Sequence, residues 1–279
     1  MCRRQDADRT FQRRDVAKFR FLIHRLMTSS KSSVSDYWQD AQRPLTCLLF
    51  LLPLIAVYEI GVWLIAGTEA GTIRNGADYW MRSWLSAWGM GQWLLLPTLV
   101  IAVLLSWHLI RKHPWKVNPE TMLGMLAESV LLAVLLMAVG QLHQLLFLSL
   151  DSPEASPTAM MLAIGDLSRA ISFVGAGVYE EVLFRLLLLP IVYGGFRILE
   201  CPPKFSAAMA AISTAFVFAL AHHVGPNADA FNAFAFTFRL AAGTFFAAIF
   251  LLRGFGITVG CHAAYDLLVG VFLVAPIAG

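Results

Sequence analysis

The sequence predicts an all-α polytopic membrane protein, and its composition supports that fold class in two ways. Of the 279 residues, 58% are hydrophobic and only 14% are charged, whereas soluble domains carry roughly 25% charged residues. The mean hydropathy is +0.67, and a soluble fold of this size cannot bury so much apolar surface. A soluble enzyme, a disordered chain and a disulfide scaffold are therefore excluded. Helices follow because a lipid-exposed backbone must satisfy its hydrogen bonds internally.

The positive charges are concentrated near the N-terminus. Residues 1–43 hold ten of the 21 Lys and Arg residues, which predicts a basic tail on the cytoplasmic side of the cell (inner) membrane. Residues 44–279 are predicted to form the transmembrane domain. Within the tail, the stretch 11–27 mixes apolar and basic residues. It fits either a helix lying on an anionic membrane surface or a partly ordered tail, and both interpretations stay open.

Seven or eight membrane spans are expected, since a span needs ~20 mostly apolar residues. The expected spans lie at about 44–67, 91–111, 124–150, 159–198, 206–223, 230–252 and 255–277. Their number depends on whether 159–198 forms one helix or two. Between the first two spans, Trp80, Trp84 and Trp88 recur at every fourth position. This stripe predicts a helix that lies at headgroup depth in the membrane interface.

Charged side chains inside membrane spans are costly, so each one is a candidate functional residue. Glu180, Glu181 and Arg185 enter one of the most apolar runs of the chain. On a helix, Glu181 and Arg185 have the i, i+4 spacing and the order that favour an ion pair. Glu180 lies about 100° further round the helix, and we expect it to be the freer group and a candidate general base. The alternative is that all three residues form one buried structural cluster.

Two further groups of polar residues lie on later apolar segments. His222 and His223 end one predicted span four residues after Phe218, and His262 precedes Asp266 by one helical turn. Each group alone fits a packing or capping role. If they meet Glu180 in one intramembrane polar cavity, they supply a base, a group that positions water and donors for an oxyanion. That set suits amide hydrolysis by activated water.

At these residues the chain resembles the CPBP family of intramembrane proteases, which includes type II CAAX prenyl endopeptidases and bacterial Abi proteins. The motifs of that family are EExxxR, FxxxH and HxxxN or HxxxD. Here they read Glu180-Glu181-x-x-x-Arg185, Phe218-x-x-x-His222 and His262-x-x-x-Asp266, in the same order. The resemblance covers about 160–275 and implies an intramembrane glutamic endopeptidase.

The resemblance also implies a role for each residue of the motifs. It implies that Glu180 activates water, that His222 helps to hold this water, and that His262 and Asp266 stabilise the oxyanion. It makes Glu181, Arg185 and, as a secondary group, His223 supporting residues.

Asp266 stands where many members of that family have Asn. An Asn amide can donate a hydrogen bond to an oxyanion, whereas an ionised Asp can only accept one. Asp266 must therefore be protonated, orient His262, or act by an indirect path.

The resemblance favours chemistry without a metal or other cofactor, with zinc held by Glu180, His222 and His262 as the alternative. The expected partners are the membrane and a membrane-associated peptide or protein substrate, with no nucleic acid. Two other functions stay open. One is a non-catalytic membrane protein that binds peptides or confers immunity on the same fold. The other is a proton-coupled transporter, suggested by ionisable residues in or near apolar runs: Glu59, Glu128, His143 and Asp166.

Overall fold

A computed structural model describes residues 36–66, 74–91, 93–148, 166–225 and 228–273. The chain divides into two units, residues 1–40 and 41–279. The predicted amphipathic stretch 11–27 lies outside the described residues, and so does most of the basic tail 1–43. All the contacts discussed below lie within the second unit.

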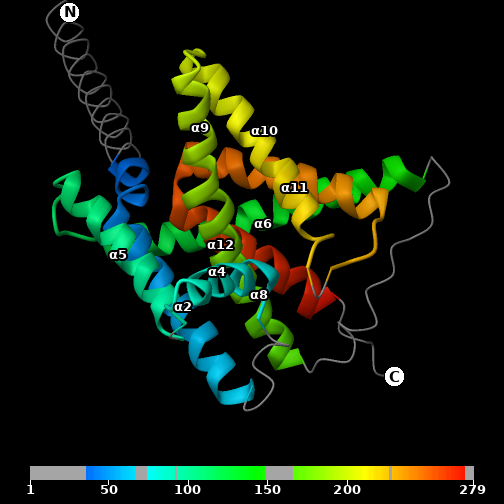
Figure 1. Ribbon diagram of the computed structural model, residues 1–279, viewed down its shortest axis with the longest axis horizontal. Coiled ribbons are helices and arrows are strands. Elements are labelled where there is room, and N and C mark those ends of the chain that lie inside the picture. Colours follow the sequence, from blue (N-terminus) through cyan, green and yellow to red (C-terminus); the bar gives the residue numbers. More distant parts are fainter. Residues whose placement is uncertain (1–35, 67–73, 92, 149–165, 226–227, 274–279) are drawn as a thin grey trace, which may run out of the picture. The chain divides into compact units, whose positions relative to one another are not determined.

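Every regular element in the described ranges is a helix (Figure 1). The α-helices are α2 (Pro44–Ala66), α4 (Gly76–Ala87), α5 (Leu95–Ile110), α6 (Pro119–Leu148), α8 (Asp166–Glu181), α9 (Leu189–Ile198), α10 (Pro203–Ala221), α11 (Ala233–Arg253) and α12 (Phe255–Leu267). Two π-helices, η1 (Val182–Leu188) and η2 (Leu268–Leu273), follow α8 and α12.

The helices are those of an integral membrane protein. Among the described residues, α2, α6, α10 and α11 are long and apolar enough to cross a membrane, and α5 and α12 are shorter apolar helices. The predicted total of seven or eight spans stays a prediction, as does the division into a tail 1–43 and a transmembrane domain 44–279.

Proline and asparagine mark where several helices begin. Pro44, Pro119 and Pro203 occupy the first residue of their helices, where a missing N–H costs nothing because that group has no partner within the helix. Asn75 and Asn232 cap α4 and α11, since their side chains accept hydrogen bonds from backbone N–H groups in the first turn. The starts of α2 and α11 lie within three residues of those expected from the sequence.

The tryptophan stripe forms a helix, as predicted. It is α4, which follows α2 in the chain. Trp84 and Trp88 are exposed, with 62% and 69% of their surface accessible, whereas Trp80 is half-buried and lines a cavity. The stripe therefore has two outward residues and one inward residue. Its depth in a membrane stays a prediction.

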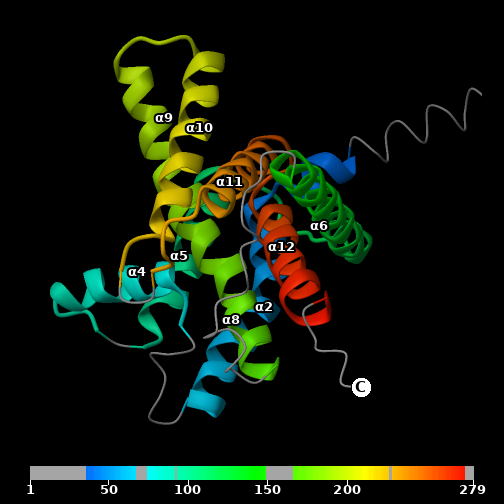
Figure 2. The ribbon, with the colours of Figure 1, turned by 90° about the vertical axis from the view of Figure 1, so that its right-hand side faces the viewer.

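Helix α12 lies at the centre of the bundle. It packs against α6, α8, α11 and α2, and Figure 2 shows it between α6 on one side and α2 and α8 on the other. Every residue from Phe255 to Ala263 is buried. A second packed layer is formed by α10, which contacts α9 and α11.

Glycine allows the central helices to approach each other closely. A Cβ atom at Gly177 would lie 2.6 Å from the backbone nitrogen of Ala263, so α8 and α12 touch backbone to backbone there. Small residues at such crossings are typical of membrane helix packing. Glu181 lies one turn after Gly177, and His262 is next to Ala263. This crossing therefore brings two of the motif residues together.

We expect Gly177→Ala to destabilise the protein, because its new methyl group has no space between α8 and α12. The loss should be about 1–3 kcal/mol, as for other overpacked cores. Gly195→Ala is the control, since Gly195 is an exposed residue of α9 with nothing within 4 Å of an added Cβ. Thermal unfolding in detergent measures both variants. Equal melting temperatures would contradict the close crossing.

Candidate active site

The first motif lies where the α-helix changes to a π-helix. Helix α8 ends at Glu181 and continues without a break into η1 and α9. The segment expected at 159–198 is thus one continuous helical run from residue 166 onward, with a π segment in its middle. Such π segments are rare and occur frequently at functional sites. No spacing rule in the sequence predicted it.

Glu181 joins an arginine and a histidine. Its Oε1 atom accepts a hydrogen bond of 2.9 Å from Nη1 of Arg185, so the predicted ion pair is present. The same oxygen lies 2.7 Å from Nδ1 of His262 on α12. Since an ionised carboxylate only accepts, Nδ1 of His262 carries the hydrogen. Glu181 therefore holds His262 as well as Arg185, a contact that the sequence did not predict.

The cluster of Glu181, Arg185 and His262 is buried and also contacts a third helix, α11. Glu181, Arg185 and His262 expose no more than 4% of their surface, and Nη2 of Arg185 donates to the backbone oxygen of Gly243 on α11 at 3.0 Å. The ring of Phe246, also on α11, stacks on His262 with centroids 4.4 Å apart and an interplanar angle of 17°. The imidazole plane is consequently fixed by α8 and α11 together.

The other nitrogen of His262 faces two carboxyl groups. Its Nε2 atom lies 3.8 Å from Oε2 of Glu180 and 3.5 Å from Oδ2 of Asp266. Three of the four predicted catalytic residues are thus neighbours. One water molecule can bridge polar groups separated by more than 3.5 Å.

His222, the fourth residue, reaches the same place from the end of α10. Its Nδ1 atom lies 2.8 Å from the backbone oxygen of Phe218, and a carbonyl only accepts, so Nδ1–H donates and Nε2 is left as an acceptor. The ring of Phe218 lies edge-on to His222 and to His262, with centroid distances of 4.9 and 6.1 Å. One phenyl ring therefore contacts both histidines.

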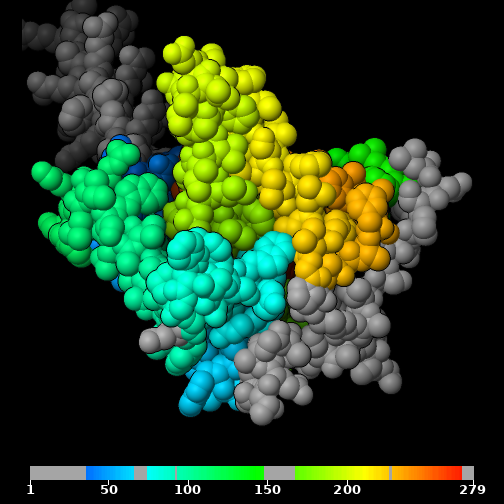
Figure 3. Space-filling view, in the orientation of Figure 1, coloured from blue at the N-terminus to red at the C-terminus, as the bar shows by residue number. Residues whose placement is uncertain are grey.

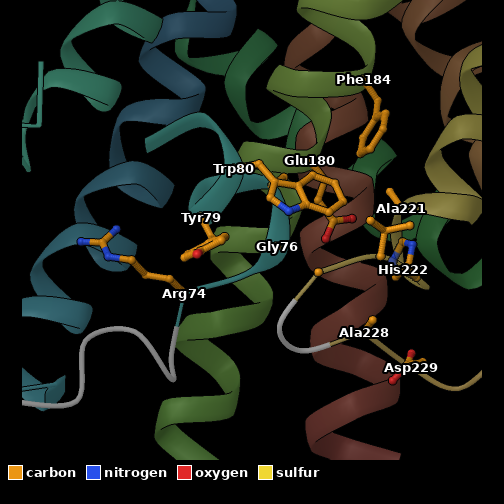
Figure 4. A pocket seen from close by; sticks show the side chains of 13 residues that line it. Arg74, Gly76, Tyr79, Trp80, Glu180, Phe184, Ala221, His222, Ala228 and Asp229 are labelled. Atoms are coloured by element: carbon orange, nitrogen blue, oxygen red, sulfur yellow. The ribbon is translucent and has the colours of Figure 1, made fainter. Parts of the chain in front are cut away.

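A cavity of about 320 Å³ connects Glu180 with His222 (Figure 4). The sequence left open whether Glu180, His222 and His262 meet. The structure brings Glu180 and His222 to one cavity, and His262 lies next to Glu180. The side chains around the cavity come from three parts of the chain and include Tyr79, Trp80, Glu180, Phe184, His222 and Asp229.

His223, the secondary supporting residue, points away from this cluster. Its Nδ1 atom lies 3.0 Å from the backbone oxygen of Asp229, and its ring lies beside Phe231. The N–H of Asp229 donates to the backbone oxygen of His222 at 2.9 Å, and its carboxylate pairs with Arg239 on α11. Asp229 thus ties the turn after α10 to α11. No motif or spacing in the sequence identified this role.

A second polar network attaches α4 to α8 and α2. The Glu59 carboxylate on α2 accepts hydrogen bonds from Tyr179, the residue before Glu180, and from Arg82 on α4 at 2.6 Å. Asp78 on α4 pairs with Arg82 at 2.5 Å and with Arg74 at 2.6 Å. Glu59, named above among the ionisable residues in apolar runs, thus connects α2 with α8 and α4. The pairing of Asp78 with Arg74 and Arg82 could have been predicted from the sequence, because these residues are spaced four apart.

The side chains do not form a metal site as they are arranged. Within the described ranges, no group of three or more His, Cys, Asp or Glu residues is placed to hold a metal ion. Of the alternative zinc set, His262 has its Nδ1 engaged by Glu181, and His222 has its Nδ1 engaged by Phe218.

A comparison with protein families identifies this part of the chain. Residues 167–268 match the family described as Type II CAAX prenyl endopeptidase Rce1-like. This segment of the chain is similar to that family. The match contains all three motifs, from Glu180 to Asp266, and confirms the resemblance found in the sequence. It supports a membrane hydrolase of the CAAX protease class, whose family implies endopeptidase activity. No curated protein and no solved structure was matched by the chain.

We expect Arg185→Met to destabilise the protein by about 3–5 kcal/mol, because it leaves Glu181 buried without its cation. The double variant Glu181→Gln, Arg185→Met removes both charges and should regain part of that loss. Arg111→Met, at an exposed arginine, is the control for general effects of the substitution. Thermal unfolding in detergent measures all three, and equal losses in the single and double variants would show that Arg185 acts by packing alone.

Proposed function

We propose that the protein is an intramembrane glutamic endopeptidase, which cleaves a membrane-associated peptide or protein with water activated by Glu180. The observation that carries the proposal is the meeting of Glu180 with both histidines. Glu180 and His222 line one cavity, and Nε2 of His262 lies 3.8 Å from the Glu180 carboxylate. These groups come from α8, the end of α10 and α12, and the two histidines are held by hydrogen bonds to Phe218 and Glu181.

In the proposed first step, Glu180 takes a proton from water while the water oxygen attacks the carbonyl carbon of the peptide. His222 positions this water, since its Nε2 atom is the acceptor left free by the bond from Nδ1 to Phe218. The attack converts the carbonyl into a tetrahedral oxyanion. Glu180 then passes the proton to the leaving amine as the carbon–nitrogen bond breaks, which returns the carboxylate to its starting state.

His262 stabilises the oxyanion in this scheme. With hydrogen on both ring nitrogens, it donates from Nδ1 to Glu181 and from Nε2 to the oxyanion. Asp266 lies 3.5 Å from Nε2. Because Nε2 carries a single hydrogen, Asp266 accepts it and orients the imidazole before the oxyanion forms, and the oxyanion then takes the place of Asp266 as acceptor. In this scheme Asp266 supplies no second donor.

The setting of the reaction is part of the proposal. The protein lies in the cell (inner) membrane with its N-terminus in the cytoplasm, as the concentration of basic residues in 1–43 suggests. No step uses a metal or another cofactor, since Glu180 and the two histidines supply the base, the positioning group and the donor.

Glu180→Gln is expected to lower kcat/KM by about 10²–10⁴-fold, the contribution typical of a general base. The assay uses purified protein in liposomes and fluorogenic peptides carrying a membrane anchor. Glu120→Gln, at an exposed glutamate of α6, is the matched control and should cleave as wild type does. If Glu180→Gln cleaves as fast as wild type, Glu180 is not the base. A Glu180→Gln variant that retains the full biological effect in cells would favour the peptide-binding or immunity function.

Metal removal distinguishes the proposed chemistry from the zinc alternative. We expect dialysis against a chelator to leave the rate of peptide cleavage unchanged, because no residue of the scheme depends on a metal. The measurement is the initial rate before and after chelation, with added Zn²⁺ as a further sample. Loss of cleavage that Zn²⁺ restores would overturn the metal-free scheme and leave the hydrolase class intact.

A further inference from the structure

One wall of the cavity comes from outside the segment that matches the Rce1-like family. That segment begins at residue 167, whereas Arg74, Tyr79 and Trp80 line the cavity from α4 and the residues before it. Figure 3 shows α4 (cyan) at the surface, next to the end of α10 (yellow). A helix that the family match does not include therefore borders the groups of the proposed mechanism.

Trp80 is the largest side chain that α4 contributes to the cavity wall. Figure 4 shows it extending from α4 into the cavity that Glu180 also lines. It also contacts Gly225, in the turn that follows His222. Gly225 has a φ of +113°, and a Cβ atom there would lie 3.3 Å from the indole nitrogen of Trp80. The indole thus fills the space between α4 and the turn that carries His222.

The position of α4, and so of Trp80, is fixed by buried charges. Asp78, two residues before Trp80, is fully buried and accepts a hydrogen bond of 2.8 Å from Tyr58 on α2. Arg82, two residues after it, reaches Glu59, which in turn accepts from Tyr179. Because Tyr179 directly precedes Glu180, the network sets the distance between the indole and the proposed base.

We propose that Trp80 determines which substrate side chains fit beside Glu180, by limiting the size of the cavity. This inference rests on the proposed function. At about 320 Å³, the cavity is at the small end of ligand pockets, so the loss of an indole would enlarge it substantially. Its wall near Glu180 also includes Phe184 and Ala221, which suits an apolar side chain of limited bulk. Trp80 limits how bulky a side chain can be next to the scissile bond.

The test compares a series of membrane-anchored fluorogenic peptides that differ at one residue beside the scissile bond. That residue is Ala, Leu, Phe or Trp. Trp80→Ala should raise kcat/KM for the Phe and Trp peptides relative to the Ala peptide by at least about 10-fold, the effect typical of pocket-size changes. Trp80→Phe should give a smaller change. Trp84→Ala is the matched control, since Trp84 lies one turn along the same helix and is exposed.

The outcomes separate this inference from the proposed function. Cleavage by wild type and its loss in Glu180→Gln test the function without reference to Trp80. The inference is tested by the ratio of kcat/KM for the Phe and Trp peptides to kcat/KM for the Ala peptide. Equal loss of cleavage of every peptide in Trp80→Ala, or an unchanged ratio, would overturn it.

A binding measurement keeps the inference testable when cleavage is absent. In a Glu180→Gln background, the dissociation constants of the Phe and Ala peptides are compared with and without Trp80→Ala. A shift in favour of the Phe peptide supports the inference, and equal constants contradict it. If Trp80→Ala does not fold, Trp80→Leu and Trp80→Phe take its place, with thermal unfolding as the check.

Discussion

A single buried carboxylate, that of Glu181, determines how the central helices are placed. A charge removed from water is tolerated only when it is paired and hydrogen-bonded. The Oε1 atom of Glu181 meets that condition through Arg185 on the same helical run and through His262 on α12. Since Arg185 also donates to Gly243, a shift of α8, α11 or α12 along its axis would leave a buried group without its partner. Because Glu180 directly precedes Glu181 in the chain, the contacts that place Glu181 also place Glu180.

The imidazole of His262 is restrained from several directions. Glu181 holds Nδ1, Phe246 stacks on the ring, and the backbone contact between Gly177 and Ala263 sets how near α8 approaches. Nε2 is then left facing Glu180 and Asp266. These restraints suit the function proposed for His262, because stabilisation of an oxyanion requires a donor whose orientation is set before substrate arrives.

Local geometry was predictable from the sequence, and long-range geometry was not. The Glu181–Arg185 pair follows from the i, i+4 spacing alone, and the Trp stripe correctly predicted α4. The contact between Glu181 and His262 depends on how deep two helices sit relative to each other, which periodicity does not specify. The ordered motifs predicted a resemblance to CAAX proteases, and the match to residues 167–268 confirms that resemblance. The motifs gave no indication that Trp80, on a helix outside the matched segment, lines the cavity.

The π segment η1 sets the rotational phase between the two halves of one long helix. It follows Glu181 directly and precedes α9. In a π-helix each turn takes up more residues than in an α-helix, so α9 faces a different direction from the one that an unbroken α-helix would give it. Loss of one residue from Val182–Leu188 would change the rotation of one half relative to the other. The number of residues in this stretch is therefore constrained, in addition to the identity of Arg185 within it.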